Sequence, residues 1–302
     1  MLLPALASLA LLAADLPAAG SVKPIEVFKT GDYSEGVVVD HAGNLYFSHQ
    51  KIVTKLRPDG SKAETWAETG SPNGHKVLAD GTHLICDASQ HAVLHLDADG
   101  KNMAPASDQS EGVNLRGPND LTLDPTGGFY FTDPGGSSLA KPVGTVHFVD
   151  PSGKTTKAAK GLAFPNGVAL RPGGKELLVG ESQKNRVLAY PVISPGKLGE
   201  PRVLVDLPRA DKAKGQKGNE PDGMALDIDG NLYVAHYGMG EVQVVSPAGE
   251  VIRRYPGGNL TTSNVAFAGP KRDQLFVTGG EPGALYRLDL GVVGVEILPK
   301  KR

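Results

Sequence analysis

The chain has 302 residues, a formal charge of −2 at pH 7, 39 glycines and 23 prolines. Glycine and proline interrupt regular structure, so this composition argues against long helices. With 40% hydrophobic and 21% charged residues, the chain has enough apolar material for a globular core, which excludes disorder for most of its length. The near-neutral charge provides no electrostatic footprint for nucleic acid or an anionic membrane, so we expect neither as a partner.

Residues 1–20 are predicted to form a signal peptide. Residues 2–14 carry no charge, and the small residues that follow, up to Gly20, suit a signal-peptidase site. The apolar run is shorter than the roughly 20 residues that a membrane-spanning helix needs. We therefore expect no membrane span and a periplasmic or secreted protein. Because no Lys or Arg precedes the run and Asp15 follows it directly, a packed or disordered N-terminal extension is the alternative.

A phrase of two short apolar runs, joined by a turn with Gly or Asp, occurs six times along the rest of the chain. Its copies begin 40 to 56 residues apart, close to the ~40–50 residues of a four-stranded propeller blade. A helical solenoid of similar period would need long stretches with helical periodicity and without Gly or Pro, and none is found. In chain order, the copies begin at Glu35, His75, Asn119, Asn166, Asp222 and Ser263.

A second, more polar hairpin usually follows each phrase, as in residues 51–62, 93–101, 145–155 and 242–251. Two hairpins make four strands, so we predict an all-β fold: a six-bladed β-propeller with four-stranded blades around a central channel, formed by residues 21–302 as one domain. The first hairpin is the more apolar and should lie nearer the axis. Residues 25–30 should pair with residues 294–299 or with a neighbouring strand, which would close the ring.

The six opening residues of the innermost strands should lie near the axis on one face. Two are carboxylates and two are amides, with no Lys or Arg among them. Like charges held together without a partner are costly, and a bound cation would remove that cost. Oxygen ligands suit a hard divalent ion, and the single cysteine, Cys86, excludes a CxxC metal site. A wet, non-catalytic channel lined by small polar residues is the alternative.

The phrases SEGVVVD, RGPNDLTLD with FYFTDP, FPNGVAL and EPDGMALDIDGNLYVAHYG follow one another along the chain. They resemble those of the gluconolactonase/regucalcin family (senescence marker protein-like lactonases), which is also similar to squid-type diisopropyl fluorophosphatase. The resemblance extends from about Val22 to Leu298 and implies a six-bladed propeller with one catalytic divalent metal ion in its channel. Among possible ions, Ca²⁺ is expected first, with Mg²⁺, Mn²⁺ and Zn²⁺ as alternatives. The implied metal ligands are Glu35, Asn166 and Asp222, with Asn119 as a fourth ligand or a substrate contact.

A divalent ion held by three or four protein oxygens keeps positions open for a carbonyl oxygen and for water. We therefore expect a hydrolase that opens a lactone or a related small-molecule ester, with Asp222 as the general base for the attacking water. A phosphotriesterase-like hydrolase using the same metal and a non-catalytic binding propeller are the alternatives, since a fold of this kind does not fix function. The sequence leaves the oligomeric state open.

Arg116 is a candidate substrate contact through the same resemblance. Some sugar-lactone members have Arg one residue before the paired Asn and use it on sugar hydroxyls, whereas Arg116 lies three positions before Asn119. A solvated loop cation is the equal alternative, and specificity for aldonolactones is correspondingly open.

Three further features complete the candidate site. The second strand of each central hairpin returns to the same face, so His236 and Asp133 are expected to support the ligands or contact the substrate. His75 opens the second copy of the phrase and is a further substrate-contact candidate, although Asn73 could take that position. The basic residues 209–223 run up to Asp222 and could form a rim that selects substrate or a solvated loop.

Overall fold

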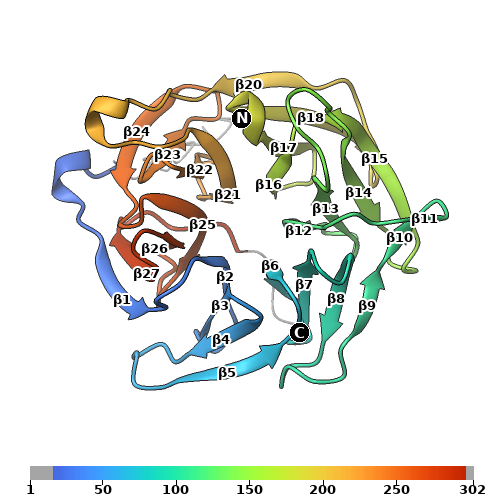
Figure 1. The fold of residues 1–302 in the computed structure, drawn as a ribbon, viewed down its shortest axis with the longest axis horizontal. Coiled ribbons are helices and arrows are strands. Elements are labelled where there is room, and N and C mark those ends of the chain that lie inside the picture. Colours follow the sequence, from blue (N-terminus) through green and yellow to red (C-terminus); the bar gives the residue numbers. More distant parts are fainter. Residues whose placement is uncertain (1–15, 297–302) are drawn as a thin grey trace, which may run out of the picture.

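The computed structural model describes residues 16–296, which form six antiparallel sheets around one axis (Figure 1). In four of the six sheets, hydrogen-bonded neighbours follow one another in chain order, as expected for strands joined by short turns; in the other two, β20 pairs with β18 and β1 pairs with β27. The first strands of adjacent sheets contact each other, so the more apolar first hairpins surround the axis. The predicted six-bladed β-propeller is confirmed.

The blades follow the chain in order, and their strands have the following bounds. Blade one is β2 (Ser34–Val39), β3 (Leu45–His49), β4 (Ile52–Leu56) and β5 (Ala63–Glu68), and blade two is β6 (Pro72–Val77), β7 (His83–Asp87), β8 (Ala92–Leu96) and β9 (Ala104–Ser107). Blade three is β12 (Leu121–Leu123), β13 (Phe129–Asp133), β14 (Gly144–Val149) and β15 (Thr155–Leu162), preceded by the short pair β10 (Gln109–Ser110) and β11 (Val113–Asn114). Blade four is β16 (Pro165–Leu170), β17 (Glu176–Glu181), β18 (Arg186–Ser194), β19 (Lys197–Leu198) and β20 (Arg202–Asp206). Blade five is β21 (Glu220–Leu226), β22 (Leu232–Tyr237), β23 (Glu241–Val245) and β24 (Val251–Pro256).

Blade six joins the two ends of the chain. Its inner strands are β25 (Thr261–Ala268), β26 (Gln274–Gly280) and β27 (Ala284–Asp289), and its outermost strand is β1 (Ile25–Lys29). In Figure 1 the blue β1 lies beside the red β27. The expected closure by a neighbouring strand is therefore confirmed, and residues 294–296 do not provide it: Gly294 bridges Asp227 of blade five. Residues 297–299 lie outside the described residues.

Buried aromatic side chains pack between adjacent blades and are tied to the turns beside them. Tyr46 and Tyr233 are each about fully buried, in the clusters between blades one and two and between blades five and six. Their hydroxyls donate to Asp40 and Asp227, which open the turns of the central hairpins, at 3.1 and 3.0 Å. Burying such a side chain contributes about 1.5–3 kcal/mol, so the repeated turn phrase also fixes the blade-to-blade packing.

The described chain begins inside the predicted leader. Leu16 packs against the core between blades five and six, and the Tyr255 hydroxyl donates to the Pro17 carbonyl at 2.8 Å. The short 3₁₀ helix η1 (Ala19–Ser21) leads to Val22, which is buried in the same core. Removal of residues 1–20 would therefore remove the contacts of Leu16 and Pro17. Residues 1–15 lie outside the described residues. No helix within residues 16–296 is long and apolar enough to span a bilayer.

Candidate functional site

The opening residues of the inner strands lie at one end of the channel. In five blades a register shift separates the first residues of the inner strand from the rest of it. Such a bulge re-aims the side chains at that point. Glu35, Asn166 and Asp222 occupy these bulges, and each is no more than 7% exposed. The structure thus brings the three predicted ligands to the same end of the channel.

Where glycine follows an opening position, the inner strands approach each other very closely. A Cβ on Gly36, which has φ +56°, would lie 1.8 Å from the Asn73 carbonyl oxygen of the next blade. A Cβ on Gly167 would lie 2.1 Å from the Asp222 carbonyl oxygen. The backbones of consecutive ligand-bearing strands are therefore in direct contact, which sets the spacing of the opening side chains.

Hydroxyl groups on the second strands hold these backbones in place. Thr132 of blade three donates to the Asn166 carbonyl at 2.7 Å, and Ser48 of blade one donates to the Asn73 carbonyl at 3.1 Å. Ser182, just after β17, donates to the Pro221 carbonyl at 2.6 Å. Each bond joins one blade to the opening segment of the next, so the ligand positions are coupled around the ring.

Glu35 is a buried carboxylate with neutral hydrogen-bond donors around it. Burial raises its pKa to about 7, and the nearby Asp120 carboxylate acts in the same direction. The Tyr33 hydroxyl donates to Oε1 at 2.7 Å, and Asn264 also donates to the side chain; both bonds favour the ionised form but do not offset burial.

Asp222 lies in the same electrostatic environment. Burial raises its pKa well above the usual range, and the carboxylates of Glu35 and Asp120 raise it further. A hydrogen bond from the Asn166 side chain partly opposes this rise. The two predicted carboxylate ligands are therefore close enough to repel each other, as a cation site requires.

Asp120 is a third carboxylate of this site that the sequence reasoning did not select. It is 2% exposed, and burial raises its pKa, against the opposing charge of Lys76. Its backbone position is the one that glycine occupies in four of the other copies, and the space beside Gly74 is filled by Asp120 itself. That departure from glycine, shared only with Asn264 in blade six, was the signal available in the sequence.

The donor set fits a divalent cation bound through oxygen. Asn119 lies just before β12, and its Oδ1 is buried without a hydrogen-bond partner among the described residues. Within residues 16–296, no three His, Cys, Asp or Glu side chains form a metal-binding group by themselves, so a site here needs the amide oxygens. Carboxylate and amide oxygens are ligands for Ca²⁺ and Mg²⁺. Glu35, Asp222, Asn166 and Asn119 are the residues that could hold such an ion.

The inner strands become apolar immediately below these positions. Val37, Val168, Met224 and Val265 each follow an opening pair and line a cavity of about 470 Å³ toward the other end of the channel. A second cavity of about 540 Å³ adjoins it around Val38, Phe267 and Val295. Apolar side chains therefore lie directly below the carboxylates. This apolar surrounding explains why burial is the largest cause of the raised pKa values of Glu35 and Asp222.

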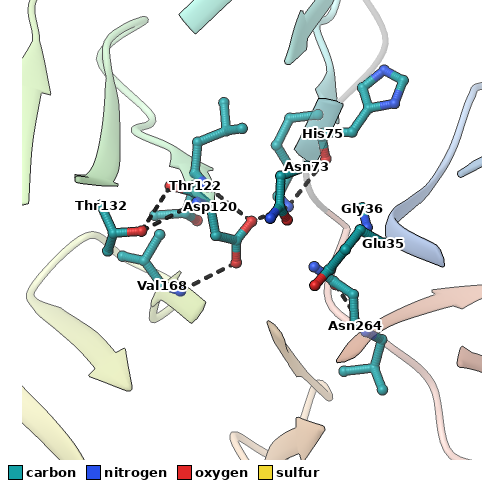
Figure 2. Close-up of polar contacts among 12 residues, drawn as sticks. Glu35, Gly36, Asn73, His75, Asp120, Thr122, Thr132, Val168 and Asn264 are labelled. Carbon is teal, nitrogen blue, oxygen red and sulfur yellow. Dashed lines mark hydrogen bonds and ion pairs between the residues drawn. The ribbon is translucent and has the colours of Figure 1, made fainter. Parts of the chain in front are cut away.

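The opening position of blade two belongs to Asn73. Pro72 pairs with Asp87 and His75 pairs with Ile85, so the bulge falls at Asn73 and His75 lies farther along the strand. Figure 2 shows Asn73 beside Asp120 and facing Glu35, while the His75 ring points away from them. His75 Nε2 lies 2.7 Å from His83 Nδ1, between blades one and two. The structure does not bring His75 to the site, because its side chain belongs to the inter-blade core.

Asp133 and His236 hold the loops and blades around the site. Asp133 Oδ2 accepts a hydrogen bond from the Arg116 backbone at 2.9 Å, in the loop that leads to Asn119. His236 Nε2 lies 2.9 Å from Asn185 Oδ1 of blade four, and burial lowers its pKa to about 4. Both groups therefore position neighbouring segments. The Arg116 side chain is exposed at the rim, where its contact with a substrate stays a prediction.

Residues 209–223, which include Asp222, form a rim that hydrogen bonds and an ion pair hold in place. The segment contains the short 3₁₀ helix η3 (Lys212–Lys214), whose first turn is capped by Asp211. The Gln216 side chain donates to the Met239 carbonyl at 3.2 Å, and Lys217 pairs with Glu281 of blade six. These bonds connect the segment to blades five and six, so its role in substrate selection stays a prediction.

Gly167→Ala should disturb the site through the backbone alone. The added methyl group would meet the Asp222 carbonyl oxygen at 2.1 Å, so blades four and five must separate. We expect kcat/KM for a hydrolysed substrate to fall at least about tenfold, and overpacking to cost about 1–3 kcal/mol of stability. Gly180→Ala is the matched control in the same blade, since its nearest contact would be an ordinary 3.6 Å. Equal activity and melting temperature for the two variants would contradict the close-contact interpretation.

The family model described as SMP-30/Gluconolactonase/LRE-like region matches residues 33–291, so the chain belongs to this family. The match spans all six blades except the outermost strand β1.

Three curated relatives have similar lengths and sequences. The diisopropyl-fluorophosphatase of Loligo vulgaris is 26% identical over 85% of this chain and 88% of the relative. The lactonase drp35 of Staphylococcus saprophyticus is 31% identical, over 88% of this chain and 84% of the relative. The gluconolactonase of Zymomonas mobilis is also 31% identical, over 84% of this chain and 78% of the relative.

Solved structures share the architecture. A gluconolactonase from Xanthomonas campestris superposes with a TM-score of 0.77 and 25% identity, over 90% of this chain and 91% of that one. Regucalcin from Agrobacterium tumefaciens, described as a calcium-binding protein, has a TM-score of 0.77 at 20% identity, over 93% of this chain and 97% of that one. The latter similarity supports the fold.

Proposed function

We propose that this protein is a divalent-cation-dependent hydrolase that opens a lactone or a related small-molecule ester. The carrying observation is the pair of buried, mutually repelling carboxylates, Glu35 and Asp222, placed with Asn166 at one end of the channel. The buried, unpartnered Oδ1 of Asn119 is a further oxygen donor for the ion. Lactonases among the relatives support this reaction class. Because the donors are all oxygens, we propose Ca²⁺ as the ion, with Mg²⁺, Mn²⁺ and Zn²⁺ as competitors.

When bound, the ion would polarise the carbonyl oxygen of the substrate as a Lewis acid. Asp222 accepts a proton from the water that attacks the carbonyl carbon. After the ring C–O bond breaks, the same carboxyl group returns the proton to the leaving alkoxide oxygen. The products are a carboxylic acid group, which then releases its proton to solvent, and a hydroxyl on one hydroxy acid.

Other residues position and enclose the reacting atoms. Tyr33 fixes the Glu35 carboxylate by its 2.7 Å hydrogen bond, and Asn166 fixes that of Asp222. Val37, Val168, Met224 and Val265 line the cavity below these groups. Arg116, at the rim near Asn119, is the proposed contact for polar groups of the substrate.

A phosphotriester is the second candidate substrate class. It is favoured by the 26% identity to a diisopropyl-fluorophosphatase over 85% of this chain. The same general base and the same open cation site would serve attack on phosphorus as well as on a carbonyl carbon.

A panel of lactones, aryl esters and phosphotriesters, each assayed with Ca²⁺, Mg²⁺, Mn²⁺ and Zn²⁺, tests the proposal. We expect the highest kcat/KM for a lactone with Ca²⁺ present. A clear preference for phosphotriesters would establish the second candidate. No turnover in any combination would leave a binding propeller as the better description.

The location of the protein is also part of the proposal. We propose export to the periplasm or the cell exterior on the strength of the uncharged residues 2–14 and the small residues after them. N-terminal sequencing of the protein recovered from its native host tests this, and the contacts of Leu16 and Pro17 favour a processing point before Leu16.

A further inference from the structure

Lys76 places a positive charge inside the channel, next to the carboxylates of the site. It belongs to β6, the inner strand of blade two, three residues after Asn73. Its side chain is 14% exposed, and its Nζ lies 3.9 Å from Asp120 Oδ1 and donates to the His75 carbonyl at 3.2 Å. The stem of the side chain lines the 470 Å³ cavity below the site. Lys76 therefore connects this cavity with the carboxylate of Asp120.

The charge balance of the site depends on this lysine. Glu35, Asp120 and Asp222 together provide three negative charges when ionised, and all three are at most 7% exposed. Of the ion pairs formed within residues 16–296, the only one that involves any of these carboxylates is the contact between Lys76 and Asp120. One divalent ion and one ammonium group would bring the total to zero, whereas the ion alone would leave one buried negative charge.

Asp120 connects the lysine to the two proposed ligands. Its carboxylate affects both Glu35 and Asp222 electrostatically, while Lys76 acts on Asp120 in the opposite direction. Backbone N–H groups of Leu121 and Val168 fix the Asp120 oxygens at 2.8 and 3.3 Å. The carboxylate is thus held toward the lysine and the strands of blades three and four.

We propose that Lys76 is a built-in counter-charge that neutralises Asp120, so that one divalent ion balances the charges of the remaining two carboxylates, Glu35 and Asp222. The inference rests on the proposed function, because it concerns the same cation. It makes Lys76 a determinant of ion affinity and of the preference for divalent over trivalent ions. Without the lysine, the site would carry an additional negative charge and would bind highly charged cations more tightly.

Terbium(III) and Ca²⁺ are suitable probes, since both bind oxygen ligands and Tb³⁺ emission can be sensitised by Tyr33 beside Glu35. We would titrate the wild-type protein, Lys76→Met, Asp120→Asn and the double variant with Tb³⁺, and then displace it with Ca²⁺. Lys76→Met should raise the affinity for Tb³⁺ at least about tenfold and the affinity for Ca²⁺ by a smaller factor. The attraction between the ion and the additional negative charge of the site is proportional to the charge of the ion. Asp120→Asn should lower both affinities, and the double variant should lie within about threefold of the wild type.

The matched control is Lys157→Met, which removes a positive charge from the exposed outer strand β15. Circular dichroism of each variant checks that the fold is kept. Tighter Tb³⁺ binding by Lys76→Met, weaker binding by Asp120→Asn and near wild-type binding by the double variant would support the counter-charge role. A merely structural contact between the two residues would instead weaken binding in both single variants. Unchanged affinities in Lys76→Met, with normal binding by the wild type, would overturn this inference alone. Absence of Ca²⁺ and Tb³⁺ binding by the wild type would overturn the proposed cation dependence and this inference together.

Discussion

Asp222→Asn should reduce kcat/KM for the best lactone substrate by at least about 10³-fold, because general-base catalysis typically contributes 10²–10⁴-fold. The asparagine keeps an oxygen at the channel end but cannot accept the proton of the attacking water. The variant should stay folded and lose the repulsion between the Asp222 and Glu35 carboxylates, so its melting temperature should not fall. Steady-state kinetics with the cation at saturation measure the effect.

Asp229→Asn is the matched control for this prediction. Asp229 lies in the turn at the opposite end of the same hairpin and is exposed, so the substitution makes the same change of charge in the same blade. We expect its kinetics to match those of the wild type. Activity of Asp222→Asn within about threefold of the control would remove Asp222 from the proposed mechanism and require another base.

Removal of divalent ions should abolish hydrolysis and lower the stability of the protein. Without a cation, the buried carboxylates of Glu35 and Asp222 repel each other. An ion present at 100 times its dissociation constant stabilises the folded state by about 2.7 kcal/mol, which corresponds to several degrees in melting temperature for a domain of this size. Calorimetry in EDTA and after addition of Ca²⁺ measures the shift, and activity should return with the ion.

Glu35→Gln separates site binding from non-specific effects of calcium. This variant lacks one carboxylate ligand, so the Ca²⁺-dependent rise in melting temperature should shrink and its midpoint should move to higher Ca²⁺ concentration. The prediction would be wrong if exhaustively chelated protein, with less than stoichiometric metal by elemental analysis, hydrolysed lactones at the full rate.

The fold could be predicted from the sequence because the same hairpin pattern occurs six times along the chain. Each blade needs two hairpins, and a hairpin is recognisable from short apolar runs and a turn such as that at Asp40 or Asp227. Six repetitions make the interpretation robust to an irregular copy. The partner of residues 25–30 could be given only as two alternatives, because pairing between the chain ends depends on where β27 lies in space.

The candidate site could be predicted in part. The topology of the repeated strand gave six opening positions, and the family resemblance implied that Glu35, Asn166 and Asp222 among them are the ligands; the structure places these three together. His75 was assigned to the site from the same reasoning, but the bulge in β6 shifts the opening position to Asn73. A bulge adds one residue without altering the hydrophobic pattern, so the pattern alone leaves the register open.

Asp120 and Lys76 were not selected, for a different physical reason. Asp120 stands where four other copies have glycine, which marks the position but not its partner. The contact between Asp120 and Lys76 joins blades two and three, and no local pattern encodes the approach of two strands separated by more than 40 residues. The function of Asp133 as a holder of the Arg116 loop depends likewise on a long-range hydrogen bond.

The direct backbone contacts at Gly36 and Gly167 have a consequence for how such a protein can change its substrate. The aperture of the channel is set by main-chain atoms of adjoining blades, so no side-chain substitution at those positions can widen it without separating the blades. Altered substrate size must therefore be accommodated above the ring, in segments such as residues 209–219 and the Arg116 loop, while the cation-binding layer keeps constant dimensions.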